Sequence, residues 1–279
     1  RGRDAMSAGA STRVAAPAGP GRPGASGSGL ARTVLPPVLL GVAAILLWQG
    51  VVTVLAIKPF ILPGPFAIGE QFITNLQNVV GGSVVTGRNA LIGLVLGAIV
   101  GVLLAILSAL VGIFDEMAAP IVAAVAVVPI VALAPVLYTM FGANAETARQ
   151  LVAALAVFVP VYFNTLKGLR MVRPVHRDLM RSYAASSWQA TKTVTLPTAV
   201  PFVFTGLRIA SSLAVISALI AEYFGGPVGG LGKSITSAAS SSNYGLAWAY
   251  VLGSIILGLL FYCAALGLEK LVSRRAPTA

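Results

Sequence analysis

Charged side chains are scarce in this sequence, and their scarcity bounds the class of protein. Asp, Glu, Lys and Arg together make up 10% of the 279 residues, whereas hydrophobic residues make up 57%. A typical soluble domain has ~25% charged and ~45–50% apolar residues. Because so few charges cannot cover a surface that faces water, the sequence predicts a chain solvated largely by lipid.

Cysteine, histidine and acidic residues are also few, and each shortage excludes a kind of site. Cys263 is the only cysteine, which excludes an intrachain disulfide framework. His176 is the only histidine, which argues against a His-rich metal site or a Ser-His triad. The acidic residues are scattered apart from Asp115 and Glu116, which we expect to be solvated in a short loop. The sequence therefore predicts no catalytic constellation, no metal site and no cofactor bound by this chain.

The net charge of +11 raises the question of nucleic-acid binding. The cations, however, gather at the edges of apolar runs and in one hydrophilic stretch, and the runs themselves carry almost none. This distribution is typical of a membrane protein, so we expect no nucleic-acid partner.

Long apolar runs are the dominant feature of the chain. A helix needs ~20 apolar residues to cross a bilayer, and uninterrupted runs without alternation exclude a membrane β-barrel. The sequence therefore predicts an all-α polytopic membrane protein with about six spans. The expected spans are Val34–Ile57, Thr86–Val111, Ala119–Phe141, Gln150–Leu166, Ala199–Phe224 and Ala247–Val272.

The ends of the chain differ in composition from this body. Residues 1–32 are rich in Gly, Ala, Ser, Pro and Arg and show no apolar period, which predicts a disordered tail. The membrane domain is expected over residues 33–275, with a short C-terminal tail at 276–279.

The distribution of Lys and Arg predicts the orientation of the chain in the membrane. With six spans both termini lie on one side, and that side collects 14 of the 19 cations, including those of residues 167–192 and Lys270. The other side has four: Lys58, Arg88, Arg149 and Lys233. By the positive-inside rule, both termini are expected to be cytoplasmic.

Glycine and proline mark expected packing and bending points. Gly93, Gly97 and Gly101 recur every four residues and would let another helix approach the second span closely. Pro129 and Pro135 interrupt the third span and Pro160 the fourth, and each favours a kink.

A few polar residues inside the spans are candidates for a pathway or a gate. Arg208 lies deep in the fifth span, where a charge needs a partner or access to water. An anionic-substrate or gating contact and simple snorkelling to the cytoplasmic interface both satisfy this need, and we favour snorkelling. Glu222 is expected to be interfacial, near the outer end of the same span. Asn164 and Ser212 complete the set of pathway candidates.

One short sequence resembles a phosphate-binding loop but does not meet its requirements. Gly232-Lys233-Ser234 would need a glycine at position 227, where Pro227 stands, and no strand precedes it. We therefore expect ATP to bind elsewhere, in a partner chain.

The longest hydrophilic stretch inside the body is the expected cytoplasmic loop 167–197, and a loop of this length is usually functional. A merely solvated connection is the alternative. The loop resembles the motif of permease subunits of bacterial ABC importers, which carry Glu-Ala-Ala, a glycine and a terminal Ile-x-Leu-Pro. Asp178 takes the place of the Glu, Ala184 that of the Gly, and Val194 with Leu196-Pro197 that of the ending, whereas Leu179 and Met180 replace the two alanines.

Further segments are similar to the branch of this family that serves nitrate, sulfonate, taurine and pyrimidine-precursor importers. They extend from about Val34 to Arg275 and occur in the family's order. They are Leu62–Pro65, Pro129–Pro135 with Phe141-Gly142, Asn164–Leu169, Gly206–Ala210, Ala221–Gly225 and Gly230–Gly232.

The resemblance implies the type I ABC importer transmembrane fold and a set of partners. Two permease chains, identical or homologous, would form the pathway, two ATPase subunits would bind ATP and Mg²⁺, and an extracytoplasmic binding protein would deliver the solute. The chain itself would be a non-enzymatic subunit of the bacterial inner membrane. By this analogy a coupling helix contacts the ATPase through Asp178, Arg181, Ser182, Ala184, Ala185 and Ser186.

The solute expected from the branch is a sulfonate- or nitrate-like anion or an aromatic heterocycle such as a vitamin precursor. The alternative hypothesis is an ion-coupled secondary transporter, which would require intramembrane acids and internal repeats. Glu222 is its main support, and no convincing inverted repeat is visible.

Overall fold

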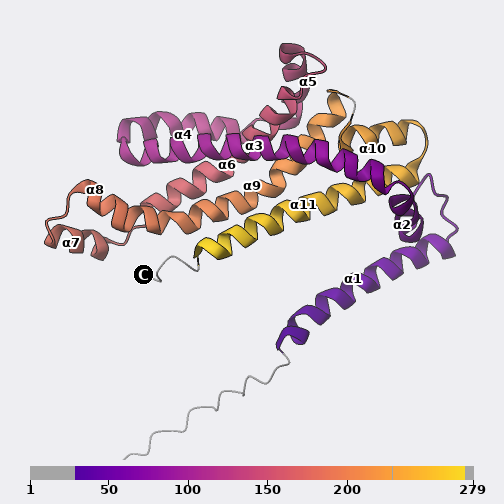
Figure 1. The fold of residues 1–279 in the computed structure, drawn as a ribbon, viewed down its shortest axis with the longest axis horizontal. Helices are drawn as coiled ribbons and strands as arrows, with labels where there is room; N and C mark the ends of the chain where they lie inside the picture. Colours follow the sequence, from indigo (N-terminus) through magenta and orange to yellow (C-terminus); the bar gives the residue numbers. More distant parts are fainter. Residues whose placement is uncertain (1–28, 228, 274–279) are drawn as a thin grey trace, which may run out of the picture. The chain divides into compact units, whose positions relative to one another are not determined.

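The structure is a computed structural model that describes residues 29–227 and 229–273. Within these residues it contains helices only, which confirms the predicted all-α class (Figure 1). The helices are α1 (Gly29–Val54), α2 (Pro65–Thr74), α3 (Leu76–Leu110), α4 (Gly112–Val127), α5 (Ile130–Phe141), α6 (Thr147–Arg170), α7 (Pro174–Ser182), α8 (Ser187–Ala190), the π-helical turn η1 (Thr191–Thr195), α9 (Leu196–Phe224), α10 (Leu231–Ser240) and α11 (Tyr244–Ser273).

The chain divides into two compact units, Arg1–Leu47 and Trp48–Ala279. The expected disordered tail lies almost wholly outside the described residues. Its last four residues, however, are helical, because α1 begins at Gly29. The expected C-terminal tail, 276–279, is also outside the described residues.

Among the residues that the structure describes, five helices are long and apolar enough to cross a membrane, and a bent pair makes a sixth span if it is counted as one. The five lie in α1, α3, α6, the α8–α9 stretch and α11, and each overlaps an expected span. Two short helices, α2 and α10, were not expected from the apolar runs.

The bent pair replaces the third expected span, which is not one continuous helix. The helices Gly112–Val127 and Ala132–Phe141 meet at an angle of 101°. Pro129 has no backbone N–H, and a residue before proline is disfavoured in helical geometry. Val128 accordingly adopts an extended backbone with ψ of 126°. Pro135 and Pro160, in contrast, lie within the continuous helices α5 and α6, so only one of the three prolines breaks its helix.

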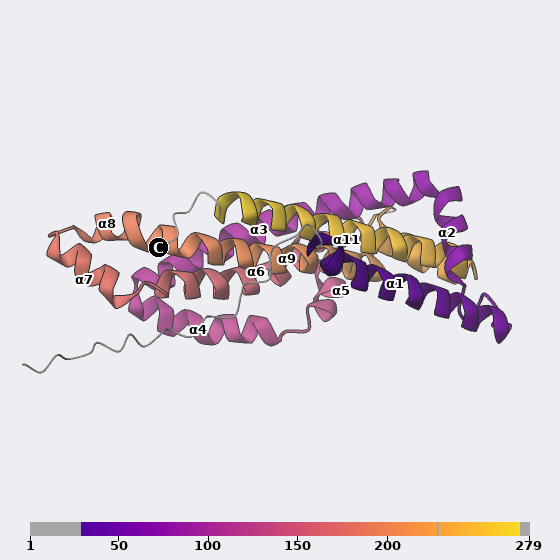
Figure 2. The same ribbon diagram turned by 90° about the horizontal axis from the view of Figure 1, so that it is seen from below.

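The core of the larger unit is formed by α6 packed between α3 and α9 (Figures 1 and 2). Gly93, Gly97 and Gly101 of α3 lie against α6, so the backbones of these helices approach closely. A Cβ atom built on Gly97 would lie 2.8 Å from Cβ of Val157, and one on Gly101 would lie 3.0 Å from O of Phe158. Bulk at either position would force the helices apart.

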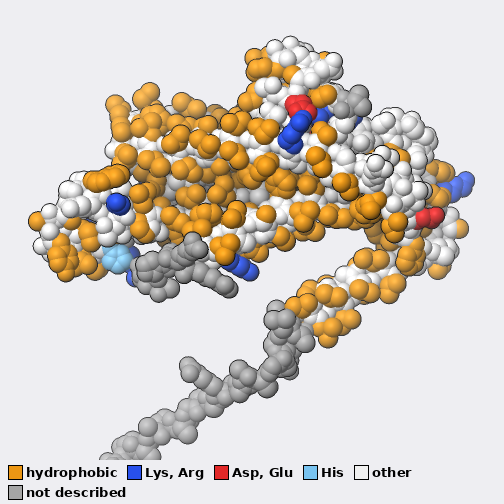
Figure 3. Space-filling view, in the orientation of Figure 1, with side chains coloured by type: hydrophobic (Ala, Val, Ile, Leu, Met, Phe, Trp, Pro, Cys, Tyr) orange, Lys and Arg blue, Asp and Glu red, His pale blue; other side chains and the backbone are white. Residues whose placement is uncertain are grey.

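The long helices run side by side, with α7 and α8 at one end of the larger unit and α2 and α10 at the other (Figures 1 and 2). On the face seen in Figure 3, apolar side chains cover the long helices, and charged side chains lie mainly toward the ends. Such a surface suits a bilayer, in which the polar ends reach water.

Candidate functional site

The connection between α6 and α9 is a compact helical structure, which we call the coupling segment (residues 171–195). Within the expected loop 167–197, α6 continues to Arg170, the short helices α7 and α8 follow, and η1 leads directly into α9. Ser186 begins α8 with a reciprocal capping box: its hydroxyl accepts from N of Gln189, and its own N–H donates to the Gln189 side chain. The segment therefore has a fixed backbone.

The turn between α7 and α8 has an alanine in a conformation that favours glycine. Ala184 has a φ of 50°. N of Ala184 donates to O of Arg181 and N of Ala185 to O of Met180, which is the hydrogen-bond pattern of a Schellman motif. The left-handed conformation costs a non-glycine residue about 1–2 kcal/mol. The position aligned with the family's glycine therefore has the backbone conformation for which glycine is preferred.

The six expected coupling residues all lie in this segment, and five of them are exposed. Asp178, Arg181 and Ser182 belong to α7, and Ala184, Ala185 and Ser186 form the turn; Ala185 alone is half-buried. Arg181 and Asp178 form a long ion pair of 3.7 Å with each other.

Large apolar side chains at the same tip were missed at the sequence level. Tyr183 is 74% exposed and Trp188 is 69% exposed, on the two sides of the turn, and Leu179 is exposed on α7. Exposed aromatic residues of this kind are typical of protein interfaces. No single-residue pattern distinguishes them from buried aromatic residues, so only the tertiary structure could reveal them.

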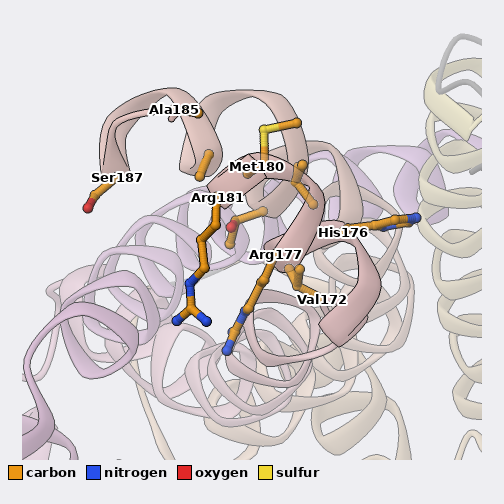
Figure 4. A pocket seen from close by; sticks show the side chains of 10 residues that line it. Val172, His176, Arg177, Met180, Arg181, Ala185 and Ser187 are labelled. Carbon is orange, nitrogen blue, oxygen red and sulfur yellow. The ribbon is translucent and has the colours of Figure 1, made fainter. Parts of the chain in front are cut away.

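A small cavity of about 250 Å³ lies inside the coupling segment, between α7, α8 and η1. Figure 4 shows that Arg177 and Arg181 extend side by side in one direction and that His176 points another way. The side of α7 with the two arginines therefore presents positive charge next to the apolar tip.

The four expected pathway residues are not brought together. Asn164 donates its side-chain amide to O of Pro160 within α6. Arg208 forms an ion pair of 3.0 Å with Glu269 of α11, so it has a protein partner. Because Glu269 compensates the charge of Arg208, the side chain does not need to snorkel to the cytoplasmic interface, as we had favoured. Ser212 lines a separate, mainly apolar cavity with residues of α10 and α11.

Glu222, expected near the outer end of its span, lies two residues before the end of α9 and is fully buried in the protein. Its carboxylate accepts hydrogen bonds from the Thr86 hydroxyl at 3.0 Å and from N of Gly232 at 2.8 Å. Nη1 of Arg149, also fully buried, lies 3.9 Å from the carboxylate. A carboxylate in lipid-embedded protein requires such partners.

Arg149, expected directly before the fourth span, lies in the first turn of α6 and is fully buried. Its Nη2 donates to O of Pro227 at 2.7 Å and its Nε donates to the hydroxyl of Tyr138 at 3.3 Å. The charge cluster (Thr86, Tyr138, Arg149 and Glu222) therefore joins α3, α5, α6 and α9 to the glycine-rich connection before α10. The sequence places both Arg149 and Glu222 at the outer ends of expected spans. Their similar expected depth in the membrane could therefore have indicated that they pair.

Two further ion pairs alter the expected loops. Asp115 lies in the first turn of α4, not in a loop, and its carboxylate is 2.6 Å from Nη2 of Arg170. Arg88 of α3 pairs with Glu146, next to the start of α6. The first pair ties the start of α4 to the end of α6, and the second ties an interior position of α3 to the start of α6.

Comparison with known proteins identifies the family. Residues 93–276 match the family described as the binding-protein-dependent transport system inner membrane component. Among solved structures, the chain is similar to an amino acid ABC transporter with histidines, with a TM-score of 0.57 and 16% identity over 74% of this chain and 96% of that one.

Several relatives cover nearly the whole described chain. The riboflavin transport system permease protein RibX of Chloroflexus aurantiacus is 31% identical over 81% of this chain and 85% of its own length. The taurine transport system permease protein TauC of Escherichia coli is 31% identical over 85% of this chain and 88% of its own length. A probable ABC transporter permease protein of Haemophilus influenzae is 28% identical over 82% of this chain and 93% of its own length. With its apolar helices and this match, the chain belongs to the binding-protein-dependent transport system inner membrane components, the multi-pass permeases of ABC importers.

Proposed function

We propose that this permease forms part of the pathway of an ATP-driven importer and couples to a separate ATPase subunit through the coupling segment. The observation that carries the proposal is the exposed tip of that segment, where Tyr183 and Trp188 flank a turn fixed by a Schellman motif. Large aromatic side chains on a rigid backbone lose little entropy on binding, so they make effective anchors in a partner's groove.

Several partners follow from family membership. Two ATPase subunits would supply ATP hydrolysis, a second permease chain would complete the pathway, and an extracytoplasmic protein would deliver the solute. The relatives carry names that refer to riboflavin and to taurine, which supports a small anion or aromatic heterocycle as the solute.

ATP and Mg²⁺ would then bind in the partner, and the Gly232-Lys233-Ser234 sequence supports this division of roles. A phosphate loop needs free backbone N–H groups. N of Leu231 instead donates to the Thr86 hydroxyl and N of Gly232 to the Glu222 carboxylate. These amides therefore serve the charge cluster.

The proposed orientation places the coupling segment and both termini in the cytoplasm. The 14 to 4 division of cations supports it, and two of the four outer cations, Arg88 and Arg149, are paired with Glu146 and Glu222. Family membership favours ATP over ion coupling, and the buried Glu222 already has protein partners, which weakens the secondary-transporter alternative.

The experiment is co-purification of the ATPase with permease variants, normalised to the amount of permease in the membrane. Trp188→Ala removes an anchor, and loss of such an anchor costs about 2 kcal/mol or more, so we expect at least about a 30-fold weaker association. Ala184→Trp adds bulk to the turn and should also reduce ATPase recovery.

Two controls isolate the interface from folding. Ala184→Gly relieves the left-handed backbone and should retain full recovery, and Ser240→Trp changes an exposed position of α10 at the other end of the bundle. Equal ATPase recovery for all four variants would show that the segment is only a solvated connection.

A further inference from the structure

A third cavity lies between α10 and α11. The α10 end of the larger unit is opposite the coupling segment (Figures 1 and 2). The cavity has a volume of about 470 Å³, and we call it the α10–α11 pocket. Small-molecule sites commonly occupy about 300–1,000 Å³. In contrast to the apolar cavities along the helices, this one has polar side chains from both helices and from the turn between them. The polar side chains that line it are those of Lys233, Ser234, Ser237, Ser241, Asn243 and Tyr250.

The pocket has hydrogen-bond donors in excess. The hydroxyls of Ser234 and Ser241 already donate to O of Gly230 and O of Ser237. Within the described part of the chain, the Lys233 ammonium and the hydroxyls of Ser237 and Tyr250 have no acceptor. A ligand that accepts several hydrogen bonds would satisfy all three.

Asn243 adds a donor whose orientation is set by the fold. Its Oδ1 accepts a hydrogen bond from N of Leu246, at the start of α11. This cap occupies the oxygen, so the side-chain NH₂ group is left to donate. The Asn243 amide therefore offers the pocket a donor.

The charge of the pocket is uncompensated. None of its described lining residues is acidic, and Lys233 forms no ion pair among the described residues. Arg149, which donates to O of Pro227 in the connection before α10, is already paired with Glu222 inside the charge cluster. The pocket thus presents one full positive charge together with neutral donors, a combination that suits an oxyanion.

The base of the pocket is rigid. The first residues of α10 are held by the Thr86 hydroxyl and the Glu222 carboxylate, directly before Lys233. This anchoring fixes the start of the helix, and it also uses the N–H groups of Leu231 and Gly232. The ligand donors are therefore side chains on a preorganised helix.

We propose that the α10–α11 pocket binds the anionic group, a carboxylate or a sulfonate, of the transported solute at the outer entrance of the pathway. This role rests on the proposed function, since it requires that this end of the permease face the extracytoplasmic side. A pocket of this size accommodates a small solute with its acidic group on Lys233. It distinguishes anionic solutes from neutral heterocycles, two classes that the family resemblance leaves open.

The test uses the complete importer complex in a neutral detergent and a matched pair of probes. Methanesulfonate carries the charge, and dimethyl sulfone has nearly the same shape without it. Saturation-transfer NMR on the probe methyl protons measures weak binding directly. We expect saturable binding of methanesulfonate and of acetate, and none of dimethyl sulfone.

Three variants assign the binding to this pocket. Lys233→Met should weaken methanesulfonate binding at least about tenfold, the loss typical of one charge-assisted hydrogen bond. Asn243→Asp keeps the cap on α11, because aspartate is a good N-cap, but replaces the donor with a negative charge. It should abolish binding without lowering thermal stability. Lys58→Met, the matched control, removes another outer cation, outside the pocket lining, and should leave binding unchanged.

Several outcomes would overturn the proposal. Methanesulfonate could bind Lys233→Met and the parent chain with equal affinity, or dimethyl sulfone could show saturable binding. Chloride could also displace methanesulfonate at equal concentration, which would indicate an inorganic anion site. These outcomes are separate from the ATPase co-purification test. If the parent complex does not bind methanesulfonate, but ATPase recovery falls in Trp188→Ala and Ala184→Trp, only the pocket is refuted. If the parent complex binds methanesulfonate, but ATPase recovery is equal for all four coupling-segment variants, only the proposed coupling is refuted.

Discussion

The buried pair of Arg149 and Glu222 should stabilise the permease far more than any exposed ion pair. Both side chains are fully buried, and the Arg149 Nη1 atom has no hydrogen-bond partner, so the Glu222 carboxylate at 3.9 Å is its compensation. Removing one partner of a buried pair leaves an uncompensated charge and costs about 3–5 kcal/mol. At about 2–4 °C per kcal/mol for a chain of roughly this size, Glu222→Gln should lower Tm by about 6–20 °C.

The variants are chosen so that the charge effect can be separated from hydrogen bonding. Glu222→Gln keeps a side-chain oxygen that can accept from Thr86 and from N of Gly232. Arg149→Met removes the other charge, and the double variant removes both. Because the second change eliminates the unpaired charge left by the first, the double variant should be about 2–3 kcal/mol more stable than the sum of the single effects predicts.

The assay is the apparent Tm of the detergent-solubilised permease, read from the monodisperse fraction after heating. Arg88→Met is the matched control, because Arg88 pairs with Glu146 and its side chain is 56% exposed. An exposed pair contributes about 0–1 kcal/mol, so its Tm should hardly change. Equal shifts for Arg149→Met and Arg88→Met, or strictly additive effects in the double variant, would refute the reasoning.

Two other predictions follow from the same structure. Gly97→Ala should destabilise the bundle by about 1–3 kcal/mol, because the added Cβ meets Val157 of α6. Gly81→Ala, on the same helix with open space around it, should be neutral or stabilising by up to about 1 kcal/mol. Comparable Tm losses for the two variants would contradict close packing of α3 on α6. In a Cys263→Ser background, a membrane-impermeant maleimide added outside intact cells should label Ser240→Cys and not Gln189→Cys; labelling of the second would reverse the proposed orientation.

The family motif in the coupling segment illustrates how far sequence reasoning reached. Spacing alone placed Ala184 at the family's glycine, and the structure gives this residue a φ of 50°. The expected limits of the loop, 167–197, were less accurate, since α6 extends to Arg170 and α9 begins at Leu196. Helix ends depend on tertiary contacts such as the Arg170–Asp115 pair, which no local pattern encodes.

The number and approximate limits of the spans were determined by the sequence itself. A bilayer requires a certain length of apolar helix, and this requirement is local, so composition within each run suffices. The break at Pro129 is local for the same reason, because a missing N–H acts on its own helix.

Only the tertiary structure decided where the polar residues go. Arg149 and Glu222 lie on different helices, and both looked interfacial because each stands near the end of an apolar run. Their burial depends on how α3, α6 and α9 pack and on the return of the chain at Gly232, which brings a backbone N–H to the carboxylate. Interactions between residues distant in the chain depend on their relative placement in three dimensions, and a hydropathy pattern contains no information about that placement.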